Sequence, residues 1–250
     1  MTDSNLRVRS VSEIVDAAFS LYRRHAKQYI TIAAIATAPS LIINLLLGGG
    51  VEPITPGDFI RMVPGVIIGL VTFALVSAVI VRMGSDVYLG GDPDVAATLQ
   101  RVLPRVPALL ASIVLTMVMV TVAALFLLLP SFYVVAVVFA TVPVIVVERL
   151  GPLAAISRSA SLSKNIKLHI LGTLVLVYGV YFGLAIGIPI LTLLVANPVI
   201  QLVVQSLLGV VSAPILNLVV MVLYYDARIR AEGFDVEHMA QSLGTSPVAS

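Results

Sequence analysis

The stretch VPALLASIVLTMVMVTVAALFLLL occupies residues 106–129 and contains no charged side chain. Because a helix rises about 1.5 Å per residue, about 20 apolar residues cross the ~30 Å hydrocarbon core of a membrane. Runs of similar character, which meet this length or nearly do, lie at 28–48, 63–81, 131–147, 168–195 and 199–225. The sequence therefore predicts a polytopic integral membrane protein with six transmembrane segments.

Composition agrees with this prediction and selects helices over a barrel. The chain is 59% hydrophobic and 11% charged, whereas soluble domains average about 45–50% and 25%. Strands of a membrane barrel alternate apolar and polar residues, but the six runs are apolar on every face. We predict an all-α helical bundle. Cysteine is absent, which excludes disulfides, thiolate nucleophiles and cysteine metal sites.

The positive charges predict the orientation of the helices. Lys and Arg total fifteen, and all except Arg61 precede the first run, follow the last, or lie in the segments after the second and fourth runs. Cytoplasmic loops are enriched in Lys and Arg. We therefore expect both termini in the cytoplasm and a bacterial-type plasma (inner) membrane. The opposite connections are a Gly/Pro-rich loop near 48–57 and tight turns at Pro130-Ser131 and Asn197-Pro198.

A threefold repeat organises the predicted single membrane domain, residues 1–239. Each repeat, at about 10–86, 92–148 and 151–226, starts with an amphipathic helix and continues into a hairpin of two spans. The three amphipathic helices are expected at 11–25, 94–105 and 152–164, lying at the cytoplasmic interface. The first should begin with a capping box of Ser10 and Glu13. Residues 240–250 are expected to form a disordered tail.

The apolar faces of these helices follow from helical spacing. The expected faces comprise Val11, Ile14, Val15, Ala18, Leu21 and Tyr22 in the first helix, Val95, Leu99, Val102, Leu103 and Val106 in the second, and Leu153, Ile156 and Ala160 in the third. Within the spans, Gly179, Gly183 and Gly187 form a ladder that predicts close helix approach, as do Gly65 and Gly69. Ser157, Ser159, Ser161 and Ser163 suggest an exposed helix face.

Each return span ends in an acidic residue near a basic one: Asp86 near Arg82, Glu148 beside Arg149, and Asp226 near Arg228. One interpretation is a cation or proton site, because carboxylates near membrane depth are costly unless paired or hydrated. The other, which we favour, is that each carboxylate pairs with an arginine or caps the next helix. No cofactor or metal is expected, since no HExxH, GxSxG or P-loop pattern occurs.

Basic residues of the cytoplasmic segments are candidate contacts for lipid headgroups, because an anionic leaflet attracts each Lys or Arg by about 1 kcal/mol. The candidates are Arg23, Arg24, Arg101, Arg105, Arg158 and Lys164. Expected partners are membrane lipids and either another membrane protein or a second copy of the chain. No nucleic-acid partner is expected.

Three segments resemble a known bacterial and archaeal family. Residues 9–25 are similar to its opening segment, residues 143–159 to its centre, and LYYDARIRAEGFD at 223–235 to its close. This is the membrane-domain family named after glycerophosphoryl diester phosphodiesterases, and the resemblance covers most of residues 7–237. In some relatives the domain precedes a phosphodiesterase barrel. Such a barrel needs about 250 residues, so we expect no enzymatic activity here.

These observations support one leading hypothesis and two alternatives. The leading one is a non-enzymatic scaffold or accessory protein that organises a partner or lipids at the cytoplasmic face. The first alternative is a lipid or small-molecule transporter with a cavity between repeats. The second is a membrane enzyme acting on lipid headgroups through Asp86, Glu148 and Asp226. A polar cavity at membrane depth would favour transport, and a solid apolar bundle would favour the scaffold.

Overall fold

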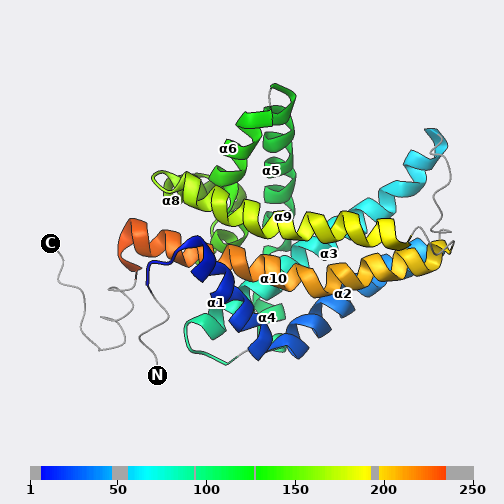
Figure 1. Ribbon diagram of the computed structural model, residues 1–250, viewed down its shortest axis with the longest axis horizontal. Coiled ribbons are helices and arrows are strands. Elements are labelled where there is room, and N and C mark those ends of the chain that lie inside the picture. Colours follow the sequence, from blue (N-terminus) through cyan, green and yellow to red (C-terminus); the bar gives the residue numbers. More distant parts are fainter. Residues whose placement is uncertain (1–6, 47–55, 93, 127, 193–196, 235–250) are drawn as a thin grey trace.

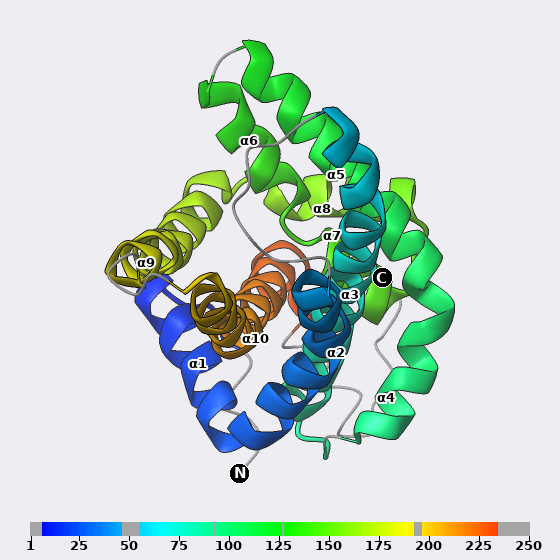
Figure 2. The same cartoon turned by 90° about the vertical axis from the view of Figure 1, so that its right-hand side faces the viewer.

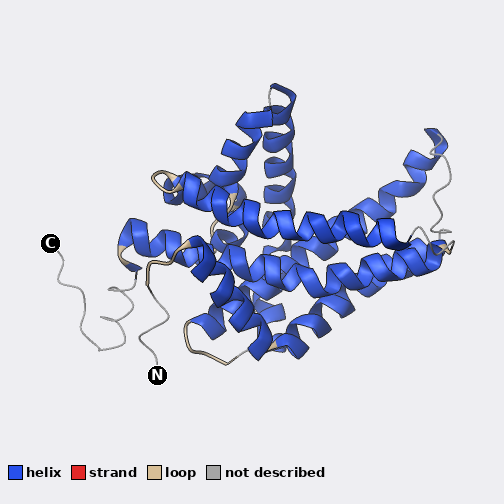
Figure 3. Ribbon diagram, in the orientation of Figure 1, coloured by secondary structure: helices blue, strands red, loops and turns tan. Residues whose placement is uncertain are grey.

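The computed structural model describes residues 7–46, 56–92, 94–126, 128–192 and 197–234. This part of the chain is built of helices and contains no strand (Figure 3), which confirms the all-α prediction. The elements in chain order are α1 Val11–Arg24, α2 Ala26–Leu46, α3 Pro56–Tyr88, α4 Val95–Val102, η1 Leu103–Arg105, α5 Val106–Phe126, α6 Leu128–Val138, α7 Thr141–Pro143, η2 Val144–Glu148, α8 Pro152–Ser163, α9 Lys167–Thr192 and α10 Pro198–Glu232.

Six helical segments are long and apolar enough to cross a membrane. They are Ala26–Ile43, Val63–Tyr88, Val95–Phe126, Pro130–Glu148, Lys167–Ile188 and Val199–Glu232. These segments support the prediction of a multi-pass helical membrane protein. The expected disordered tail at 240–250 and most of the Gly/Pro-rich loop lie outside the described residues.

The long helices do not all run in one direction. Helices α2, α9 and α10 run along the long axis of the molecule, with α10 between the other two, whereas α5 and α6 stand crosswise to them (Figures 1 and 2). Helix α10 occupies the centre and packs against α1, α2, α3 and α9. The sequence did not predict this crosswise pair, because apolarity on every face carries no information about packing direction.

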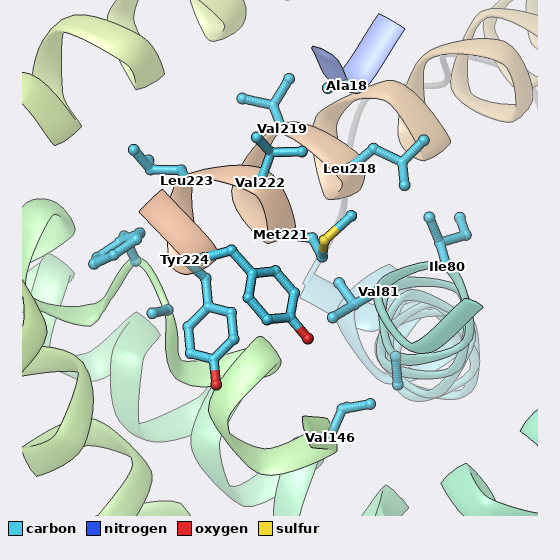
Figure 4. Close-up of a cluster of buried hydrophobic side chains, with 14 of the residues drawn as sticks. Ala18, Ile80, Val81, Val146, Leu218, Val219, Met221, Val222, Leu223 and Tyr224 are labelled. Carbon is cyan, nitrogen blue, oxygen red and sulfur yellow. The ribbon is translucent and has the colours of Figure 1, made fainter. Parts of the chain in front are cut away.

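The best-packed part of the core surrounds the second half of α10. Leu218, Met221 and Val222 are fully buried there, and Leu218 and Met221 lie on the side of α10 that faces Ile80 and Val81 of α3 (Figure 4). Gly84 of α3 makes this contact possible, because a Cβ at that position would lie 2.5 Å from Leu218 Cδ2. The prediction that two glycine ladders bring helices close together was wrong within this chain. A Cβ would meet no atom within 4 Å at Gly179, Gly183, Gly187, Gly65 or Gly69.

The short helix α1 starts as the sequence predicts. Ser10 Oγ accepts a hydrogen bond from Glu13 N at 3.4 Å, and Glu13 Oε2 accepts one from Ser10 N at 2.8 Å. These bonds, with that from Arg7, lower the pKa of Glu13 to about 2. The capping box therefore stabilises the folded state above the ordinary pKa of 4.5 and loses its contribution as the pH falls toward 2. Of the predicted apolar face, Ile14, Ala18, Leu21 and Tyr22 are buried, and Val11 and Val15 are half-buried.

The faces of the other short helices were predicted less well. In α4, which Asp94 caps through Ala97 N, Thr98 and Val102 are buried, whereas Leu99 and Leu103 are exposed. In α8 the buried residues include Ala155, Ser159 and Leu162, and the predicted Leu153 is 71% exposed. The small side chains of α8 face inward because that helix packs against α5, α6 and α7.

The fourth predicted span, 131–147, is present as Pro130–Glu148, but it is not one regular helix. Helix α6 ends at Val138, and the chain resumes as α7 and the π-helix η2. Pro143 explains the break, because its ring excludes the carbonyl of Phe139 four residues earlier and it has no N–H to donate. The turn predicted at Pro130-Ser131 was also misplaced, since both residues lie inside α6.

Ser159 of α8 satisfies the backbone groups that the break releases. Its hydroxyl donates to Val137 O at 2.6 Å and accepts from Ala140 N at 3.0 Å. An unpaired backbone group inside a membrane costs several kcal/mol, so a break of this kind needs such a partner. The expectation of an exposed serine face was therefore half wrong: Ser159 and Ser163 are buried, and Ser157 and Ser161 are exposed.

Replacement of Ser159 by alanine should destabilise the protein. Ser159→Ala removes both bonds at the break and leaves buried backbone groups unpaired, which should cost about 2–3 kcal/mol. The measurement is thermal unfolding in a mild detergent. Ser161→Ala is the matched control, because its exposed hydroxyl bonds only to Arg158 O in its own helix. Equal unfolding temperatures for the two variants would contradict this role of Ser159.

Candidate functional site

Three consecutive residues near the end of α10, Tyr224, Tyr225 and Asp226, each contact a different part of the chain. All three are buried, and Asp226 is only 1% exposed. Their side chains reach η2, the end of α3, and the segment before α1, respectively. We call these three residues the α10 junction.

Asp226 fixes the segment that leads into α1. Its Oδ1 accepts a hydrogen bond from Arg9 N at 2.7 Å, and its Oδ2 accepts one from Arg230 Nε at 2.7 Å. Arg230 also donates to Arg9 O at 2.7 Å, so both backbone groups of Arg9 are bound. His169 Nε2 of α9 lies 3.3 Å from Asp226 Oδ2. Because a charge is buried only when it is paired, this carboxylate joins three segments that are distant in sequence.

Tyr224 connects α10 to the end of the broken fourth span. Its hydroxyl donates to Glu148 Oε1 at 2.8 Å, and Glu148 Oε2 accepts from Arg158 Nε of α8 at 2.9 Å. Arg158 also pairs with Glu232, which accepts from Arg228 Nε at 3.2 Å. The hydrogen bond to Glu232, followed by that to Glu148, raises the pKa of Arg158 above its ordinary value. Negative and positive side chains thus alternate in the order Glu148, Arg158, Glu232 and Arg228.

Tyr225 connects α10 to the C-terminal end of α3. Its hydroxyl shares a 2.5 Å hydrogen bond with Ser85 Oγ, and its ring stacks on Tyr88 at 5.2 Å between centroids. The Arg9 guanidinium lies over the Tyr88 ring, 5.8 Å from its centre. These aromatic contacts close the region between α3, α10 and the segment before α1.

Asp86 lies outside this junction and pairs with basic residues of two helices. Its Oδ1 is 2.8 Å from Arg82 Nη2 on α3, and its Oδ2 is 3.9 Å from Arg101 Nη1 on α4. It lines a pocket of about 360 Å³ together with Asp92, Asp94 and Arg101.

Each of the three predicted acidic residues therefore has a basic or hydrogen-bonding partner, but two of the partners differ from those expected. Asp86 pairs with Arg82 as the sequence indicates. Glu148 pairs with Arg158 instead of Arg149, and Asp226 pairs with Arg230 instead of Arg228. Within the described ranges, no group of three or more His, Asp or Glu side chains is arranged to hold a metal ion.

The six predicted headgroup contacts lie in different surroundings. Arg23, Arg24 and Lys164 are exposed, and the Arg23 guanidinium lies over the Phe19 ring at 5.6 Å. Arg101 is half exposed, and Arg105 donates to the carbonyl of Arg149 at 3.1 Å. Arg158 is turned toward Glu148 and Glu232.

Sequence reasoning missed the residues that organise the site. Tyr224 and Tyr225 lie at the end of the last apolar run, 199–225, where no pattern marks them as polar partners. The bonds of Arg9 to Asp226 and Arg230 come from its backbone, which no side-chain pattern reveals. Ser159 carried a signal, because a serine in the middle of an otherwise small-residue helix face is available to bond a neighbouring backbone. Comparisons of the chain with family models, curated proteins and solved structures found no match.

Neutralising the junction carboxylate should destabilise the protein. Asp226→Asn keeps the shape of the side chain but leaves Arg230 without its counter-charge beside a buried amide, at a cost of about 2–3 kcal/mol. Thermal unfolding in detergent measures the effect. Asp16→Asn, which removes an exposed carboxylate from α1, is the control and should change stability little. Equal stability of the two variants would show that the Asp226 charge is not required.

Proposed function

We propose that this chain is a non-enzymatic integral membrane scaffold or accessory protein, which organises a partner or lipids at the cytoplasmic face. One observation carries the proposal. The three interfacial carboxylates, which are the strongest candidates for chemistry, are all engaged in contacts that hold segments together. A catalytic or ion-carrying carboxylate needs to be free to accept a proton or a ligand, whereas these three serve the architecture.

The proposed architecture has three repeats, each a cytoplasmic interfacial helix followed by a hairpin of two spans. It is supported by the order of elements, since the short helices α1, α4 and α8 each precede a long helix. It is also supported by packing, because α2 contacts α3, α5 contacts α6, and α9 contacts α10. Membership in the phosphodiesterase-type membrane-domain family, both termini in the cytoplasm and location in a bacterial-type plasma membrane belong to the same proposal.

The outer surfaces of the short helices suit an interface that receives another molecule. Phe19 of α1 is exposed next to Arg23, and Leu153 of α8 projects from the helix that carries Arg158. Apolar and basic side chains on one helix surface are typical of binding at the headgroup region. We infer that these helices form the cytoplasmic docking face.

A second candidate function, lipid or small-molecule transport, is favoured by one groove. It has a volume of about 400 Å³ and lies between the second and third proposed repeats. Its lining is almost wholly apolar and includes Phe132 and Phe139 near α6, Leu171 and Tyr178 of α9, and Val220 of α10. An acyl chain matches such a lining, while a polar solute does not.

Gentle purification in mild detergent, followed by quantitative mass spectrometry of the associated proteins and lipids, tests the scaffold. We expect a membrane-protein partner at a fixed stoichiometry, reduced about tenfold in Phe19→Ser/Leu153→Ser, which removes two exposed apolar contacts. Leu125→Ser is the matched control, because Leu125 is 81% exposed near the far end of α5.

A partner-free chain that holds one defined lipid would contradict the scaffold and favour transport. Val175→Trp, which fills the groove from α9, should then expel that lipid.

A further inference from the structure

Four arginines from four parts of the chain line one small crevice. Arg82 belongs to α3, Arg101 to α4, Arg105 to η1, and Arg149 to the turn between η2 and α8. Val102 and Val146, both buried, complete the lining, and the crevice has a volume of about 10 Å³. A space of this size admits about one water molecule or one ligand oxygen atom.

The positive charge of the crevice is only partly balanced. Asp86 is the carboxylate that pairs with it, at 2.8 Å from Arg82 and 3.9 Å from Arg101. Arg105 bonds to a neutral acceptor, the Arg149 carbonyl. Asp92 and Asp94 face the neighbouring pocket, which Arg101 also lines, and Asp94 caps α4. Four guanidinium groups around one carboxylate leave a net positive site that favours an anion.

Two details indicate that the crevice is prepared for an oxygen ligand. Arg82 Nε is buried and has no hydrogen-bond partner among the described residues, although a buried donor normally has an acceptor. Arg149 has φ of 60°, the one positive φ found at a described non-glycine residue. Such a backbone is costly for a long side chain and is found where function or surrounding contacts require it. The hydrogen bond from Arg105 holds this turn in place.

We propose that the four arginines bind a phosphate group, carried by an anionic phospholipid headgroup or by free phosphate. One phosphate oxygen enters the crevice toward Arg82 Nε, and the exposed Arg101 and Arg149 close around the remaining oxygens. Arginine suits this ligand, because its planar fork of donors matches phosphate geometry. The lipid source rests on the proposed function, which places this end of the molecule at the cytoplasmic leaflet.

The test is native mass spectrometry of the full-length protein in a neutral detergent. The protein receives equal amounts of phosphatidylglycerol and of a diacylglycerol with the same acyl chains, which lacks phosphate. Arg101→Gln/Arg149→Gly should lower phosphatidylglycerol binding about thirtyfold, because each arginine near an anionic lipid contributes about fivefold in affinity. Glycine at 149 also accepts the positive φ without strain. Arg7→Gln/Lys27→Gln removes the same charge from exposed positions before α1 and at the start of α2, and should bind like the wild type.

A second arm adds inorganic phosphate to the wild-type complex. Displacement of the lipid supports a site that also takes free phosphate, and retention of the lipid supports a headgroup site that requires the acyl chains. The proposal is overturned if the wild type shows no preference for phosphatidylglycerol and binds no phosphate, or if both double variants lose binding equally. The scaffold proposal is tested separately, by recovery of a protein partner from native membranes. Failure of the phosphate site would therefore not count against the scaffold.

Discussion

A carboxylate buried near the end of a membrane helix must be neutralised, and the neutralisation of Asp226 determines how this protein is assembled. The carboxylate has backbone and guanidinium donors from Arg9 and Arg230 on its two oxygens. Because leaving either charge alone would be costly, α10 and the segment before α1 are held together. Tyr224 and Tyr225 extend the same junction to η2 and α3. One short sequence, Tyr224-Tyr225-Asp226, thus joins α10 to the segment before α1, to the end of α3 and to η2.

The rest of the molecule departs from this junction in different directions. Because the helix breaks after Val138, α6 runs in a different direction from η2. The α5–α6 pair stands crosswise to α9 and α10 (Figure 1). Ser159 makes the break tolerable by bonding both exposed backbone groups. The crosswise position also leaves the apolar groove between α6 and α9 open. Rigid polar contacts at one end and aliphatic surfaces elsewhere suit a protein that presents a fixed face to a partner or to lipids.

The sequence predicts what depends on local patterns, and misses what depends on tertiary distance. The apolar runs and the Ser10–Glu13 cap follow from composition and spacing, and the structure has both. The partners of Glu148 could not be predicted, because Arg158 and Tyr224 reach it only after α8 and α10 have packed. The prediction of the buried face of α8 was wrong for the same reason. Hydrophobicity favours Leu153 there, but the close packing of α8 against its neighbouring helices places the small residues Ala155 and Ser159 inside.

Hydrogen exchange over residues 9–24 tests the central claim, that Asp226 fixes the start of the chain to α10. The protein is followed by mass spectrometry in detergent as wild type and as Asp226→Ala, which removes both acceptor oxygens. We expect strong protection of this segment in the wild type and fast exchange in the variant, while α5 at 106–126 keeps its protection, because it packs mainly against α6, α3 and α8. Unchanged protection of residues 9–24 in Asp226→Ala would contradict the account.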